Sequence, residues 1–366
     1  MRNAHRLEKL WWRSLDAPAW SARWLFRLGF LTPLSWAYGA IVFLRGRASS
    51  PCPTSGPIVV AIGSVTVGGA GKTPVTAVLA QALIERGERV GVVLSGYGRT
   101  ERGARVLHGV AADTASVESV GDEALVIGRA APTATIVVDE DKLRGVETLR
   151  SGGEVSVILI DDALQTRNLE VDFHIAVLNV ATPLSHYRLL PAGALRVGLG
   201  TLDSVDAIIV TNADIATFAE SGYALKSVAR HYGGALYSTI RKVGALDEVG
   251  EIVSNPIRSI CLVSALARND LFWRLAKERG FEVVTQVAFP DHHAYDERSV
   301  EQVSHACRVS NAGAILTTAK DWSKMRSLDW PQAMYILNQV YEIPDGASLV
   351  ERILGSRSLR RNGDSR

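Results

Sequence analysis

Residues 63–75, GSVTVGGAGKTPV, place glycines, a lysine and a threonine in the order used by phosphate-binding loops. The β-branched run PIVVAI before them predicts a buried strand, and VTAVLAQALIER after them has apolar residues at helical spacing. Pro74 is expected at the first position of that helix. Backbone N–H groups and the helix dipole would then face phosphate oxygens. The alternative is a glycine-rich turn beside an ordinary surface lysine.

The P-loop interpretation gives the residues of this segment definite roles. Lys72 would reach the β- and γ-phosphates of a nucleotide, and Thr73 would hold Mg²⁺. Thr66 departs from the general pattern G-x-x-x-x-G-K-[ST], which has glycine at that place. The expected nucleotide-binding residues are Thr66, Val67, Gly68, Gly69, Ala70, Gly71, Lys72 and Thr73.

Two pairs of acidic residues could serve such a loop. Asp161 and Asp162 end the apolar run VSVILI, which is where a carboxylate reaches Mg²⁺ in P-loop proteins. Acids at strand ends are also ordinary helix caps, and that alternative stays open. Asp122 and Glu123 in VGDEALVIGR lie between a loop and a helix, where a lone aspartate most simply caps the helix.

The segment FPDHHAYDE carries a further candidate group. It places Asp291, His292, His293 and Tyr295 between a strand and a helix. Adjacent histidines face different ways and make poor joint metal ligands, and the chain offers no cysteine cluster to complete a zinc site. An aspartate and a histidine brought together across a cleft could instead deprotonate a hydroxyl group.

The elements that must position these residues alternate between strands and helices. Further continuously apolar runs of strand length are RVGVVL, ATIVV, VSVILI, FHIAVLN and VDAIIV. Such runs, separated by helical segments, predict an α/β fold with a P-loop NTPase-like parallel sheet and helices on both faces. Acids at the carboxyl ends of the strands would face the crevice in which ligands bind.

A second alternation of strands and helices begins near residue 257 and predicts a smaller C-terminal α/β domain. The expected organisation is an N-terminal membrane-associating helical segment (1–50), a P-loop domain (51–232), a two-stranded linker (233–256), the smaller α/β domain (257–354) and a basic tail (355–366). With 366 residues, the chain is long enough for two domains.

Composition and charge exclude several classes of protein. The chain is 47% hydrophobic and 21% charged, which is typical of a folded protein. Cys52, Cys261 and Cys307 are far apart and give neither a disulfide framework nor zinc spacing, which suits a reducing cytoplasm. The net charge is +2, and no patch of nucleic-acid-binding size is evident.

The basic charge lies at the two ends of the chain. Residues 1–50 hold eight Lys/Arg against two Asp/Glu and five of the eight tryptophans, a combination typical of a membrane interface. Residues 30–44, FLTPLSWAYGAIVFL, are uncharged but shorter than the ~20 residues that span a bilayer. The favoured interpretation is a helix lying in the cytoplasmic leaflet. A tilted span starting at Trp24 and a helical hairpin packed on the protein itself remain alternatives.

Eight motifs in order give the chain a specific resemblance. They are LTPLSWAYG, TVGGAGKTP, GYGR, VGDEALVI, DDALQTRNL, LLPAGALR, FPDHHAY and TAKDWSKM. Together they resemble the tetraacyldisaccharide 4′-kinase family of lipid A synthesis, whose loop begins with Thr or Ser at the position of Thr66. This chain departs from the family pattern at Ser95, Ala163, Thr166, Val197 and in VSALARND.

The resemblance implies a function, a site and a location. It implies transfer of the γ-phosphate of ATP, with Mg²⁺, to the 4′-hydroxyl of a tetraacylated glucosamine disaccharide 1-phosphate. It implies that Asp122 is the catalytic carboxylate, assisted by His292, and that Glu123, Asp161 and Asp162 surround the metal. The implied place is the cytoplasmic face of the inner membrane, with an acylated disaccharide lipid as partner. No obligate protein partner is evident from the sequence.

Two other classes of protein compete with the lipid kinase. A P-loop ATPase or switch protein of another family would use the same loop and acids without an acceptor pocket. GTP use is not expected, because TNAD and TAKD lack the N-K-x-D spacing. A non-catalytic membrane-binding homologue is the third class, and intact Lys72, Asp122 and Asp161 argue against it.

Overall fold

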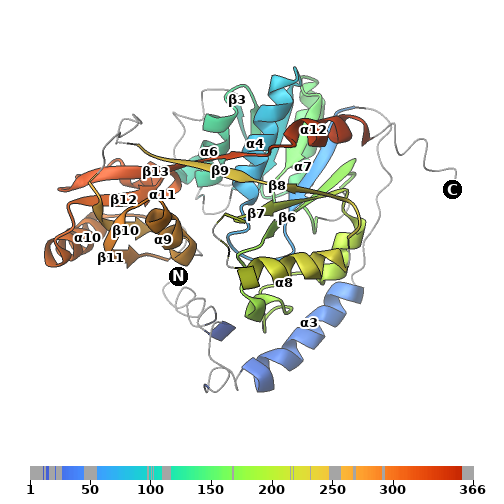
Figure 1. The fold of residues 1–366 in the computed structure, drawn as a ribbon. Coiled ribbons are helices and arrows are strands. Elements are labelled where there is room, and N and C mark those ends of the chain that lie inside the picture. Colours follow the sequence, from blue (N-terminus) through green and yellow to red (C-terminus); the bar gives the residue numbers. More distant parts are fainter. Residues whose placement is uncertain are drawn as a thin grey trace.

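The computed structural model describes most of the chain and contains two β-sheets, each with its own helices (Figure 1). The described residues are 11, 14–15, 21, 27–44, 56–96, 99, 101, 103–108, 117–166, 169–214, 216, 218–230, 232–246, 257–266, 269–290 and 293–356.

Among the described residues, the larger sheet has eight strands, and it carries the P-loop. In spatial order they are β3 (Arg105–His108), β4 (Thr135–Val138), β2 (Val90–Leu94), β5 (Val157–Ile160), β1 (Ile58–Gly63), β6 (Phe173–Asn179), β7 (Ala207–Thr211) and β8 (Ala235–Ser238). All neighbours are parallel except β3 and β4, which confirms the parallel sheet. The antiparallel edge strand β3 was not predicted, because its four residues are mostly exposed and form no apolar run.

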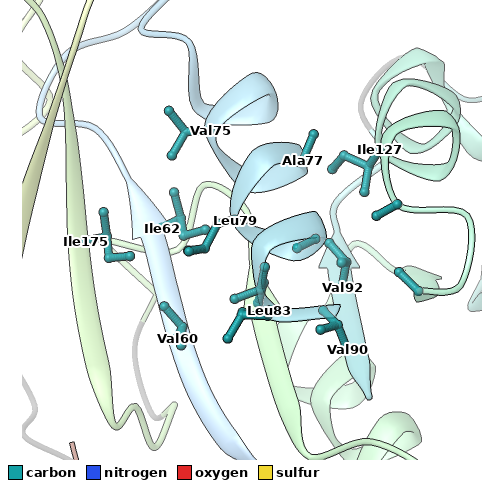
Figure 2. Packing of buried hydrophobic residues seen from close by; sticks show 14 of the residues in the cluster. Val60, Ile62, Val75, Ala77, Leu79, Leu83, Val90, Val92, Ile127 and Ile175 are labelled. Carbon is teal, nitrogen blue, oxygen red and sulfur yellow. The ribbon is translucent and has the colours of Figure 1, made fainter. Parts of the chain in front are cut away.

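Helices cover both faces of this sheet, as expected. They are α4 (Lys72–Glu85), α5 (Val117–Val120), α6 (Asp122–Ala130), α7 (Lys142–Gly152), α8 (Phe218–Ala229) and the 3₁₀ turns η3 (Leu184–His186) and η4 (Leu199–Ser204). Alternate strand residues face opposite ways, so one set packs under α4 and α6 and the other under α7 and α8. Figure 2 shows Leu79 and Leu83 of α4 beside Ile62 and Val60 of β1.

Helix α4 begins earlier than the sequence predicted. It starts at Lys72, so Pro74 is its third residue and not its first. The proline is tolerated because N–H groups of the first turn have no intrahelical partner to lose.

The smaller sheet has five strands in the part of the chain that the structure describes. In spatial order they are β11 (Glu282–Ala288), β10 (Ser259–Ser264), β12 (Ala314–Thr318), β13 (Ala333–Glu342) and β9 (Ile240–Leu246). Helix α9 (Asn269–Glu278) packs on one face, and α10 (Glu297–Ser310) and α11 (Ala319–Met325) pack on the other. Strand β9 runs antiparallel to β13, and the other pairs are parallel.

The expected two-stranded linker and the end of the smaller domain take a different form. The two strands of the linker, β8 and β9, belong to different sheets and are separated by Thr239 alone. Helix α12 (Gly346–Leu354) was assigned to the smaller domain, but it lies against α4 and β1 (Figure 1). This assignment is corrected because buried Leu349, Val350 and Ile353 join the core cluster of the larger sheet.

The N-terminal region contributes the π-helix η1 (Arg27–Leu31) and helix α3 (Thr32–Leu44). The Ser35 hydroxyl donates to the carbonyl of Leu189 at 2.8 Å, and the Tyr38 hydroxyl donates to the carbonyl of Arg196 at 2.8 Å. Helix α3 is therefore docked on residues 189–196. Its large exposed apolar side chains, with that of η1, are Phe30, Leu34, Trp36 and Ile41. Among the described residues, no helix combines the length and the hydropathy that crossing a membrane requires.

Candidate active site

A cavity of about 770 Å³ lies between the P-loop and the smaller domain, a size typical of ligand sites. One wall comes from the larger sheet and from Leu190 and Pro191, and the other comes from α9, α11 and β13. Its charged lining residues are Lys72, Asp122, Glu123, Asp162, Arg196, Arg241 and Lys320. The cavity therefore combines acids, bases and an apolar wall from two sheets.

The P-loop joins β1 to α4 as the sequence predicted. Gly68 and Gly71 have positive φ angles of 75° and 83°, a region that favours glycine. A Cβ atom on Gly71 would lie 3.3 Å from Cγ2 of Thr211. The loop thus ends at the N-terminus of α4 in the geometry that directs backbone N–H groups at an anion.

Polar groups from three neighbouring segments hold the loop in place. The side-chain amide of Asn179 donates to the carbonyl of Gly69 at 3.2 Å. The hydroxyl of Thr211 donates to the carbonyl of Ala70 at 2.8 Å. The amide of Val67 donates to the carbonyl of Ala194 at 2.8 Å. Asn179 and Thr211 were not predicted as site residues. Their only signal is their position as the last residues of β6 and β7.

Lys72 is paired with a carboxylate and is not an ordinary surface lysine. Its Nζ lies 3.4 Å from Oδ1 of Asp162, whose Oδ2 lies 2.9 Å from Nη1 of Arg196. Burial alone would raise the pKa of Asp162, but Lys72 and Arg196 outweigh it and hold that pKa below its usual value. Lys142 donates to the backbone carbonyl of Asp162. Arg196 and Lys142 were not predicted as site residues.

Thr73 lies between two acids at the start of α4. Its hydroxyl is 3.4 Å from Oε1 of Glu123 and 3.3 Å from Oδ2 of Asp161. A hydroxyl and carboxylates are the hard oxygen donors that Mg²⁺ prefers. Within the described part of the chain, no three His, Cys, Asp or Glu residues close on one point. The donor set therefore fits a cation that takes its remaining ligands from nucleotide phosphates and water.

The two acids around Thr73 both have pKa values raised by burial. Burial, followed by the charges of Asp161 and Asp122, raises the pKa of Glu123 to about 7, against the opposing effect of Lys320 and Lys72. Burial also raises the pKa of Asp161, although Lys72 opposes it. Asp161 and Asp162 form a turn after β5, and neither is the N-cap of a helix. Glu123 is also not an N-cap, because Gly121 caps α6. The helix-cap alternative for Asp161 and Asp162 is therefore excluded.

Asp122 lines the same cavity as Lys72. It is the first residue of α6, and the N-cap is Gly121, with a φ of 82°. The cap interpretation of Asp122 is thus not supported. The side chain is only 2% exposed, and its Oδ2 lies 3.3 Å from Nζ of Lys320 and 3.0 Å from Nζ of Lys324. Both lysines belong to α11 of the smaller sheet, and neither was predicted as a site residue.

The histidine pair is only half described. Asp291 and His292 lie outside the described residues, so their predicted roles stay predictions. His293 stacks on Phe289 with ring centroids 4.4 Å apart, and its Nε2 lies 3.0 Å from the hydroxyl of Ser299. His293 is therefore engaged within the smaller domain, next to the capping box of α10.

Comparison with known proteins agrees with this geometry. A profile of the tetraacyldisaccharide-1-P 4′-kinase family matches residues 28–357. The tetraacyldisaccharide 4′-kinase of Parvibaculum lavamentivorans is 32% identical over 314 residues, covering 84% of this chain and 85% of the relative. That of Anaeromyxobacter dehalogenans is 31% identical over 330 residues, covering 86% and 85%.

A solved structure gives the same result at the level of the fold. LpxK from Aquifex aeolicus, crystallised in complex with ATP, matches with a TM-score of 0.67 and 25% identity, over 89% of this chain and 98% of that chain. The profile match spans the P-loop, the acids and both sheets. The chain therefore belongs to the tetraacyldisaccharide-1-P 4′-kinase family.

Proposed function

We propose that this chain transfers the γ-phosphate of ATP to the 4′-hydroxyl of a tetraacylated glucosamine disaccharide 1-phosphate, as the family name implies. The observation that carries the proposal is the shared cavity. The P-loop lysine Lys72 and the buried carboxylate of Asp122 line it together, so a phosphate donor and a base can act on one acceptor oxygen.

A residue of the chain can be assigned to each step of the phosphoryl transfer. Lys72 and the loop amides would hold the β- and γ-phosphates and offset the charge that develops on them. Asp122 would accept the proton of the acceptor hydroxyl while the acceptor oxygen bonds to phosphorus and ADP leaves. His292 would orient Asp122 or take the proton onward, as the family resemblance implies.

The chain's oxygen donors would hold Mg²⁺ beside the nucleotide. The hydroxyl of Thr73 and the carboxylates of Glu123 and Asp161 lie close enough to share it. Asp162 would act from farther away, because Lys72 and Arg196 already pair with its carboxylate. The metal, when bound, neutralises charge on the β- and γ-phosphates.

The acceptor would enter from the side of the N-terminal helix. Trp11, Leu190 and Pro191 line the cavity, and the indole N–H of Trp11 donates to the carbonyl of Pro191 at 2.7 Å. Helix α3 is docked on the same segment through Ser35 and exposes apolar side chains. We therefore place α3 on the cytoplasmic face of the inner membrane, where acylated lipids are available.

The decisive experiment supplies γ-labelled ATP, Mg²⁺ and the tetraacylated disaccharide 1-phosphate in mixed micelles. Label should appear in the lipid with wild-type protein and be absent with a folded Lys72→Ala variant, which loses the cation on the phosphates. The competing function is a P-loop ATPase without a lipid acceptor. Label released only as inorganic phosphate, at a rate that the lipid does not change, would favour that alternative.

A further inference from the structure

The stretch TAKDWSKM, residues 318–325, has no role in the function described so far. It forms the end of β12 and helix α11 of the smaller domain. Lys320 and Lys324 are four residues apart and therefore project from one face of the helix. Both ammonium groups reach the same oxygen of Asp122, at 3.3 Å and 3.0 Å, across the boundary between the two sheets.

The direction of these lysines is fixed by a buried network. Thr318 caps α11 by accepting a hydrogen bond from the amide of Asp321 at 3.1 Å. The carboxylate of Asp321 accepts from the hydroxyl of Thr318 at 2.8 Å and from the amide of Ala265 at 3.2 Å. Asp321 is fully buried. The start of the helix is thereby attached to the loop after β10, which leaves the lysines facing α6.

The two lysines differ in their access to the cavity. Lys320 lines it, and its side chain is 25% exposed. The side chain of Lys324 is only 10% exposed. The cavity that Lys320 lines also contains Lys72 and Glu123. Lys320 thus faces the reacting groups, whereas Lys324 contacts Asp122 from a more enclosed position.

We propose that this lysine pair is the smaller domain's contribution to catalysis: Lys324 is a positioning residue that holds Asp122, and Lys320 is a catalytic residue that contacts the transferred phosphoryl group. In the step, the acceptor oxygen forms its bond to the γ-phosphorus and passes its proton to Asp122. The bond from that phosphorus to the bridging oxygen breaks, and ADP leaves with the electron pair. Lys320 offsets the charge on the phosphoryl oxygens.

This arrangement makes catalysis depend on contact between the two sheets. Lys72 approaches the phosphates from the larger sheet, and Lys320 approaches from the smaller one. The P-loop alone would bind ATP, but the second cation reaches the phosphoryl group only when α11 lies against α6. The proposal rests on the kinase function and on the role of Asp122 proposed above.

The test compares Lys320→Met, Lys320→Arg, Lys324→Met and Lys324→Arg, with Lys277→Met of α9 as the matched control. We expect each methionine variant to lower kcat roughly 10- to 100-fold, with the Kd for ATP within about twofold of wild type. Arginine at 320 should restore most of the loss, because it returns the charge. The control should keep wild-type kcat, since Lys277 contacts the ring of Trp273 away from the cavity.

A double-mutant cycle distinguishes positioning from structural support. If Lys324 acts through Asp122, then Lys324→Met should cost less than about threefold in kcat when Asp122→Asn is already present. The double variant also removes the buried carboxylate charge from which Lys324→Met alone withdraws one of its two cations, so it guards against simple misfolding. Fully multiplicative effects, or a lower melting temperature with unchanged kcat, would overturn the positioning role.

The outcomes separate this inference from the function on which it rests. Suppose that the wild-type enzyme labels the lipid and that its activity depends on Asp122. Wild-type kcat in both methionine variants would then overturn only the roles proposed for Lys320 and Lys324. Absence of lipid labelling by wild-type protein, or full activity of Asp122→Ala, would overturn the proposed function and the lysine pair together.

Discussion

Asp122 is the residue on which the proposed chemistry depends most. It is nearly fully buried and shares the cavity with Lys72. We expect Asp122→Ala to lower kcat by roughly 10²–10⁴ with little change in ATP affinity, because a base acts on the acceptor and not on the nucleotide. Steady-state kinetics together with nucleotide binding measure both. An unchanged kcat would exclude Asp122 as the base.

A second prediction concerns His292 and its proposed action through Asp122. If the histidine acts through Asp122, the double variant Asp122→Ala/His292→Ala should lose less than the product of the two single losses. His293→Ala is the neighbouring control, since His293 contacts Phe289 and Ser299 in the smaller domain. Independent, multiplicative losses would argue against a catalytic pair.

Glu123 predicts a pH dependence of metal binding. Its pKa is raised to about 7, so below neutral pH the acid holds a proton that a bound cation must displace. The apparent affinity for Mg²⁺ in the presence of ATP should therefore rise roughly tenfold from pH 6 to pH 8 and level off above. Glu123→Gln has no carboxylate to titrate and should keep only the contribution of ATP itself. Equal slopes for both proteins would contradict the prediction.

At the scale of elements, the proposed membrane-binding role of helix α3 can be tested by substitution. Trp36 of this helix is 73% exposed, and Ile41 is exposed as well. Trp36→Ser with Ile41→Ser should lower binding to anionic lipid vesicles roughly tenfold, because about 1–2 kcal/mol of apolar burial is lost. The Kd for ATP should not change. Val309→Ser, an exposed apolar residue of α10, is the control.

Vesicle sedimentation at two salt concentrations measures this prediction. Point substitutions are preferable to deleting the helix, since Tyr38 of α3 donates to the carbonyl of Arg196, which pairs with Asp162 in the site. A deletion would disturb both functions at once. If the double variant still sediments with vesicles as wild type does, the attachment lies elsewhere in the chain.

The sequence predicted most elements, and the reasons are local. The parallel strands are continuous apolar runs, so their length and burial follow from composition alone. The P-loop, the acids after β5 and the acids at the start of α6 are each a short contiguous stretch of the sequence. Strand β3 was missed because an exposed edge strand carries no apolar pattern.

The missed site residues share a different property. Arg196, Lys320 and Lys324 reach the site from segments remote in sequence, and a lone basic residue resembles any solvated one. Only the folded chain places them beside Asp162 and Asp122. Spacing along the sequence therefore predicted the contiguous loop and missed the residues that tertiary contacts supply.

At the scale of the whole molecule, helix α12 carries the chain back to the larger sheet. Leu349 is fully buried in the core cluster that includes α4. Leu349→Ala should destabilise the protein by roughly 2–5 kcal/mol, the usual cost of such a cavity, and speed amide exchange in α4. Glu351→Ala on the same helix is the control, because it removes only an exposed ion pair with Arg86.

Hydrogen exchange read out by mass spectrometry measures this effect segment by segment. Faster exchange confined to the smaller sheet would show that α12 supports that sheet. The sequence could not reveal this connection, since α12 follows β13 directly and its apolar spacing fits either sheet equally well.

The step from β8 to β9 has a consequence for how such enzymes can evolve. Thr239 alone separates two strands that close the edges of different sheets. A recombination breakpoint after β9 would leave the resident β9 to pair with an incoming β13, and a mismatch between them would expose the edge of β13 to pairing with other chains. The products of hybrid genes that exchange only one sheet should therefore aggregate unless β9 and β13 remain matched. The smaller sheet therefore constrains the sequence of β9, the strand that follows the larger sheet directly.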